Sequence, residues 1–161
     1  MATEKKTVVY ETTNSYHTLN QHTQNTKNVW LVCHGMGYLS KYFIKHFNTL
    51  NSEENYIIAP QAPSKYYLKD DYKHVGASWL TRVDTQMEIS NVMQFLNAVC
   101  LSERLFDGNA PLLFGFSQGV SIAMRWLVRS QANCPKIVLY AGSIPNEIGP
   151  EDLRFINYEK T

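Results

Sequence analysis

The sequence lacks three features that would indicate other protein classes: an excess of one charge, a long apolar run and paired cysteines. Fifteen basic and fourteen acidic side chains give a net charge of +1, so charge provides no reason to expect nucleic acid as a partner. No stretch approaches the ~18 apolar residues of a membrane span, and the first residues contain no apolar core of a signal peptide. We therefore expect a cytoplasmic protein without a membrane span.

The three cysteines show neither the number nor the spacing of a disulfide framework or a zinc site. Cys33, Cys100 and Cys134 are far apart in the chain, form no C-x-x-C pair, and lie in or beside apolar runs. Such cysteines are typically buried free thiols in a reducing compartment. We expect no metal site and no cofactor.

Four short apolar runs without polar alternation are present, as is typical of strands that are covered on both faces of a parallel sheet. With 161 residues, of which 44% are hydrophobic and 18% charged, the chain has the composition and length of one globular domain, 1–161. The predicted strands are Val29–Cys33, Asn55–Ala59, Pro111–Phe116 and Lys136–Ala141. A hairpin formed by residues 6–12 and 15–20 would precede them, giving six strands in all.

Helical patterns separate these strands. Apolar residues recur at helical spacing from about 85 to 100, residues 120–128 are apolar nearly all round, and a shorter helix is expected over 40–50. The alternation of strands and helices predicts an α/β fold with a mainly parallel sheet flanked by helices. Residues 60–84, which contain prolines and several tyrosines, are predicted to form a long loop.

The strongest indication of function is the segment Gly115-Phe116-Ser117-Gln118-Gly119, which lies between a predicted strand and a predicted helix. A G-x-S-x-G sequence in that context predicts a nucleophile elbow, with Ser117 exposed on a tight turn. Gly115 and Gly119 would be required because side chains there would collide with neighbouring backbone. The alternative is a serine that only caps the helix, with glycines that allow close packing.

A second glycine-rich segment, His34-Gly35-Met36-Gly37, directly follows the strand that ends at Cys33. Acyl transfer requires two donors for the oxyanion, and one of them usually comes from a loop of this kind. We assign the backbone N–H groups of Met36 and Gln118 to this role, with Gly35 allowing the loop to turn its N–H inward. His34 is either a catalytic base or, as we favour, a residue that holds the loop by hydrogen bonds.

Four motifs in this order and at this spacing resemble the phospholipase/carboxylesterase group of α/β hydrolases, which includes the acyl-protein thioesterases. They are HGMG (34–37), APQAP (59–63), GASW (76–79) and GFSQG (115–119). The resemblance implies the α/β-hydrolase fold, an ester or thioester substrate, Ser117 as nucleophile and Met36 and Gln118 as oxyanion donors. It also implies Trp79 as a wall of the acyl pocket, with ordinary core packing as the alternative. Tyr66, Tyr67 and Tyr72 either line a substrate groove or are simply exposed.

The acid and the histidine of a catalytic triad are not recognisable after the nucleophile. In this fold they follow the serine in the chain, but Asp152 is the only later aspartate and no histidine follows Ser117. Asp152 comes too early by strand count, and the tail 152–161 reads as the approach to a further strand. We therefore expect that the last two strands, with both partners, are absent and that this chain alone is weakly active. A third reading supplies the base from His74.

Two functions compete at this point. The first is a serine esterase or thioesterase that forms an acyl-enzyme on Ser117 and needs no cofactor. The second is a catalytically inactive, hydrolase-like binding or scaffold protein. In either case Lys136–Ala141 would be an apolar edge strand, so we expect self-association through it.

Overall fold

A five-stranded sheet organises residues 1–106 and 110–156, which the computed structural model describes. In space its strands run β1-β3-β2-β6-β7, and every neighbouring pair is parallel except β1 with β3. The predicted mainly parallel α/β architecture is therefore confirmed. The strand bounds are β1 Tyr16–Leu19, β2 Asn28–Cys33, β3 Asn55–Pro60, β6 Leu112–Phe116 and β7 Ile137–Tyr140.

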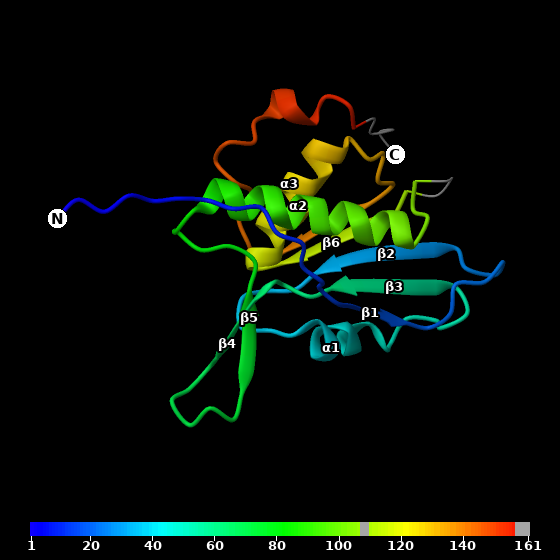
Figure 1. Ribbon diagram of the computed structural model, residues 1–161. Coiled ribbons are helices and arrows are strands. Elements are labelled where there is room, and N and C mark those ends of the chain that lie inside the picture. The colour runs from blue at the N-terminus through cyan, green and yellow to red at the C-terminus, as the bar shows by residue number, and fades with distance from the viewer. Residues whose placement is uncertain (107–109, 157–161) are drawn as a thin grey trace.

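Helices cover both faces of this sheet. Helices α2 (Thr85–Ser102) and α3 (Gln118–Ser130) lie on one face, and α1 (Ser40–Phe43), which continues into the 3₁₀ helix η1 (Ile44–Phe47), lies on the other (Figure 1). A second 3₁₀ helix, η2 (Pro150–Leu153), follows β7. Within 1–106 and 110–156, no helix combines the length and the apolarity that crossing a bilayer would require.

The two faces of the sheet contribute to two hydrophobic clusters, because side chains alternate along each strand. On β2, Leu31 and Cys33 belong to the larger cluster, which includes Leu96 of α2 and Trp126 of α3. Val32, between them, belongs instead to the smaller cluster around α1 and η1. Burial on both faces explains why β2 is a continuous apolar run.

Two expectations about the irregular parts of the chain are wrong. Residues 6–12 form no strand and are exposed, and β1 pairs with β3 rather than with an N-terminal hairpin partner. The long loop predicted for 60–84 contains an antiparallel hairpin of β4 (Ser64–Tyr67) and β5 (Val75–Ser78), which projects from the body of the molecule (Figure 1). The main sheet therefore has five described strands rather than six.

Helix α3 packs unusually close to β2 at Gly119. A Cβ placed on Gly119 would lie 2.1 Å from the carbonyl oxygen of Cys33 and 2.7 Å from that of His34. One placed on Gly115 would lie 2.7 Å from the Cα of Val120. Backbone rather than a flexible side chain occupies both positions, so the expected requirement for glycine at 115 and 119 is explained by packing alone.

This contact makes Gly119→Ala a test of the packing between the helix and the sheet. We expect urea unfolding to show a loss at the upper end of the about 1–3 kcal/mol that overpacking costs, because the backbone of β2 or α3 must shift. Gly149→Ala is the matched control, since a Cβ there would meet nothing nearer than Asp152 Oδ2 at 3.9 Å. Equal unfolding midpoints for the two variants would contradict the packing described.

Candidate active site

Ser117 occupies the corner between the end of β6 and the start of α3. Its backbone has φ 52° and ψ −119°, a conformation that costs most residues about 1–3 kcal/mol. Its N–H donates to the carbonyl oxygen of Tyr140 at the end of β7 (2.9 Å), and its carbonyl oxygen accepts from Val120 N–H (3.0 Å). The residue is half-buried, and its hydroxyl makes no hydrogen bond to any residue that the structure describes.

The loop formed by residues 34–37 lies directly against this corner. A Cβ placed on Gly35 would be 3.1 Å from Ser117 Cβ and 3.0 Å from the ring of Phe116. Met36 follows with 60% of its surface exposed. Across 1–106 and 110–156, neither the backbone N–H of Met36 nor that of Gln118 has a hydrogen-bond acceptor. Met36 directly follows Gly35, and Gln118 directly follows Ser117, so both free amides belong to residues next to the corner in the sequence.

His34 is fully buried and both its ring nitrogens are engaged. Nδ1 lies 2.8 Å from the carbonyl oxygen of Gly35, and Nε2 accepts from the N–H of Ala62 (3.1 Å). The ring is therefore neutral, with its proton on Nδ1. Burial lowers the pKa of His34, although its hydrogen bond to Gly35 acts in the opposite direction. This environment fits the loop-holding role that we favoured over the catalytic base.

Trp79 lies in the core rather than at the surface. It is 0% exposed, its indole N–H donates to the carbonyl oxygen of His34 (2.7 Å), and its ring packs 5.0 Å from that of His34. These contacts fit the packing alternative. Its part in an acyl pocket stays a prediction.

The three hairpin tyrosines separate into two groups. Tyr67 and Tyr72 pack edge to face, 5.1 Å apart, and are 55% and 70% exposed. Tyr66 lies nearer the site, since its hydroxyl would be 3.8 Å from a Cβ on Gly37. A groove along the hairpin stays a prediction.

Sequence reasoning missed a group of aromatic side chains beside Ser117. The ring of Phe116 lies 5.7 Å from that of Tyr38 and stacks at 5.8 Å on that of Tyr140. Tyr140 is the register partner of Phe116 in the sheet and is 62% exposed. Aligning the two parallel strands in register would have predicted this pair, whereas nothing local in the sequence indicates Tyr38.

No acidic or basic side chain forms a hydrogen bond with Ser117 in the described part of the chain. His74 is exposed at the end of the loop that connects β4 and β5, where its carbonyl oxygen accepts from Leu68 N–H (2.8 Å). The carboxylate of Asp152 accepts from the N–H of Gly149 (2.8 Å) in η2. Residues 157–161, the end of the tail expected to approach a further strand, lie outside the described residues.

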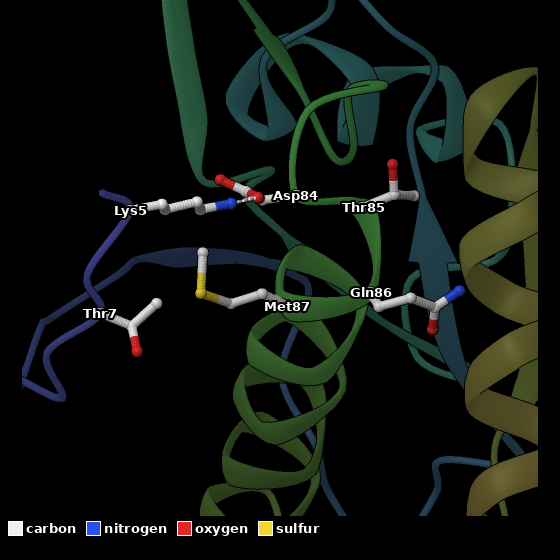
Figure 2. A pocket seen from close by; sticks show the side chains of 6 residues that line it. All are labelled: Lys5, Thr7, Asp84, Thr85, Gln86 and Met87. Atoms are coloured by element: carbon white, nitrogen blue, oxygen red, sulfur yellow. Dashed lines mark hydrogen bonds and ion pairs between the residues drawn. The ribbon is translucent and has the colours of Figure 1, made fainter. Parts of the chain in front are cut away.

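A pocket at the start of α2 contains none of the predicted site residues. Figure 2 shows its side chains, with Lys5 of the N-terminal segment in an ion pair with Asp84 at the helix start. Its lining is Lys5, Thr7, Asp84, Thr85, Gln86 and Met87. Among the residues described, no cluster of three or more His, Cys, Asp or Glu is arranged to hold a metal ion.

Comparison with known proteins gives structural matches only. No family model and no curated protein matches the sequence. A phospholipase/carboxylesterase from Dyadobacter fermentans superposes with a TM-score of 0.63 at 20% identity, covering 89% of this chain and 68% of that protein. Acyl-protein thioesterase 2 of Zea mays superposes with a TM-score of 0.55 at 17% identity, and the match covers 89% of this chain and 71% of that protein.

A carboxylesterase from the archaeon Nitrososphaera gargenis is also similar. Its TM-score is 0.54 at 16% identity, and the match covers 91% of this chain but only 48% of that enzyme. This chain has the α/β-hydrolase fold. The expected likeness to the phospholipase/carboxylesterase and acyl-protein thioesterase structures is confirmed at the level of that fold.

The buried neutral ring of His34 predicts a pH dependence of stability in this α/β-hydrolase fold. Its pKa is lowered in the native state, so below the usual value of about 6.5 the unfolded chain binds a proton that the native chain does not. Stability contributed by the neutral ring is present above that pH and declines as the pH falls through it, by at most about 1.4 kcal/mol per pH unit.

Urea unfolding at several values between pH 7.5 and pH 5 measures this slope. We expect His34→Gln to flatten it, whatever its effect on stability at neutral pH. His22→Gln, at an exposed position, is the control and should leave the slope unchanged. A slope that survives His34→Gln intact would show that other groups cause it.

Proposed function

We propose that this chain is a serine hydrolase acting on carboxylic ester or thioester bonds, with Ser117 as the nucleophile. The observation that carries the proposal is the corner at residue 117. A non-glycine residue with φ 52° is held between a strand and a helix, with a hydroxyl free of any bond to the described residues. Strain of this kind persists where the surrounding structure imposes it and is concentrated at functional sites.

Two backbone amides are proposed as the oxyanion donors. Met36 lies in the loop whose Gly35 contacts Ser117, and Gln118 is the first residue of α3. Neither N–H has an acceptor among residues 1–106 and 110–156. Both could therefore bond to the oxyanion without first breaking another hydrogen bond. The positive end of the α3 dipole would stabilise the same charge.

The substrate class rests on the chemistry of these groups and on the neighbouring side chains. Serine attack on an acyl carbonyl gives an acyl-enzyme, which water hydrolyses to the free acid, and no metal or cofactor takes part. Phe116, Tyr38 and Tyr140 offer an apolar surface beside the serine for the acyl or alcohol part. The names of two structural neighbours, a phospholipase/carboxylesterase and an acyl-protein thioesterase, agree with this class.

We expect the 161 residues alone to react slowly. A serine hydroxyl keeps its high pKa unless a base accepts its proton, and loss of the histidine in another serine hydrolase lowers kcat by about 10⁶. His34 cannot serve because both ring nitrogens are engaged. The remaining reactivity would come from the oxyanion donors and from binding.

Labelling with a fluorophosphonate probe and mapping the modified peptide tests the proposal. We expect slow modification at Ser117, abolished in Ser117→Ala and unchanged in Ser52→Ala, which alters an exposed serine. Labelling that persists in Ser117→Ala would contradict the assignment. Complete failure to label would favour the competing hypothesis of a hydrolase-like binding protein, and rapid turnover of p-nitrophenyl esters would contradict the slow rate.

Self-association through β7, expected from the sequence for Lys136–Ala141, is our second proposal. This strand is the last in the order of the described sheet, and Leu139 and Tyr140 are 37% and 62% exposed. The carbonyl oxygens of Lys136 and Tyr140 bond to β6 and its corner. By the alternation of a strand, the N–H and carbonyl of Leu139 therefore point outward and are available to a second copy.

Sedimentation velocity of Leu139→Pro and Leu139→Ala tests this pairing. Proline removes the outward N–H while leaving the bonds to β6 in place, whereas alanine removes only side-chain surface. We expect oligomers in the wild type, fewer in the alanine variant and a monomer in the proline variant. Association that is unaffected by proline would assign it to another surface.

A further inference from the structure

The segment Ala77–Leu80, at the end of β5, holds the loop that carries Met36 at two points. The N–H of Gly37 donates to the carbonyl oxygen of Ala77 (2.8 Å), and the indole N–H of Trp79 donates to the carbonyl oxygen of His34 (2.7 Å). These anchors lie on either side of Gly35 and Met36. The position of the Met36 amide is therefore set by the position of this segment.

The same segment is held from its other side by the side chain of Gln118. Its Oε1 accepts from the backbone N–H of Trp79 (2.9 Å), and its Nε2 donates to the carbonyl oxygen of Leu80 (2.8 Å). Ser78 Oγ lies 3.1 Å from Nε2 and 3.3 Å from Oε1. The carboxamide thus bonds at one end to the N–H of Trp79 and at the other to the carbonyl of the next residue, Leu80.

Only a carboxamide at the end of this side chain satisfies both partners. The segment presents one donor and one acceptor, and Gln118 presents the complementary acceptor and donor. A carboxylate would keep the bond from Trp79 but place a second acceptor against the carbonyl of Leu80. An apolar side chain would leave the N–H of Trp79 without its acceptor, which is costly for a buried donor, whereas the carbonyl of Leu80 would keep the hydroxyl of Ser78 (2.8 Å) as a donor.

From this arrangement we infer that the Gln118 side chain is a positioning residue, which fixes the distance between the two oxyanion donors of the proposed hydrolase. Its own N–H is one donor. Its side chain holds residues 78–80, and this segment in turn holds the loop that contains the other donor, the N–H of Met36. The inference rests on the proposed function, but the linkage among Gln118, Trp79 and the loop can be tested separately.

The first measurement is the rate of fluorophosphonate modification of Ser117 in the full chain. Because removing one oxyanion donor outright lowers rates by about 10²–10³, we expect a partial displacement in Gln118→Met and Gln118→Glu to slow labelling about tenfold or more. Gln94→Met is the matched control, since Gln94 is exposed on α2 and, among the described residues, its side chain hydrogen-bonds only to Ser90, at 3.4 Å. Unchanged rates in both Gln118 variants would overturn the inference.

The second measurement is amide hydrogen exchange, which does not depend on reactivity. In Gln118→Met we expect the Gly37 amide, bonded to Ala77, to exchange at least tenfold faster, while the amide of Leu31 in the core strand β2 keeps its protection. Faster exchange at both sites would indicate general destabilisation. In that case exchange is compared in Gln118→Glu, which retains one of the two bonds, and faster exchange at Gly37 alone would support the inference. Gly37 protection that is unchanged in both variants would overturn the inference, even if wild-type Ser117 failed to label and the proposed function fell.

Discussion

The backbone conformation of Ser117 is the constraint on which the rest of the site depends. A φ of 52° at a non-glycine residue is unfavourable in isolation, and three neighbouring strands hold it in place. Gly115 on β6 leaves room for the start of α3, Gly119 allows that helix to contact β2, and the carbonyl of Tyr140 on β7 accepts the Ser117 N–H. The corner is therefore a product of the assembled sheet rather than of the pentapeptide alone.

Side chains, rather than sheet pairing, connect the loops that surround this corner. His34 accepts from Ala62, Trp79 donates to His34, and Gln61 accepts from both the N–H and the hydroxyl of Ser40. The APQAP and GASW segments thus support the HGMG loop from two sides. No buried side-chain nitrogen or oxygen in the described part of the chain lacks a partner, and such a fully bonded network favours one arrangement of the loop.

The centre of the sheet could be predicted from the sequence because β2 and β3 are largely buried on both faces, and their unbroken apolar runs indicate this directly. The tight turn at Ser117 between a strand and a helix could be predicted because the residues two positions before and after it, Gly115 and Gly119, have no room for a side chain. The β4–β5 hairpin could not, since its exposed tyrosines and lysines show no alternation toward a core. The contacts of Gln118 with Trp79 and Leu80 were also beyond prediction, because they join residues about 40 positions apart that only the tertiary fold brings together.

The pairing of β2 with β6 has a consequence for the order in which the molecule assembles. Val32 pairs with Phe114, about 80 residues later in the sequence, so one side of the central strand stays open until β6 has been made. Closing so long a loop is entropically slow, and the open strand is vulnerable to incorrect pairing in the meantime. Because Ser117 directly follows β6, the strained corner at residue 117 and the protection of the central strand arise in the same step of assembly.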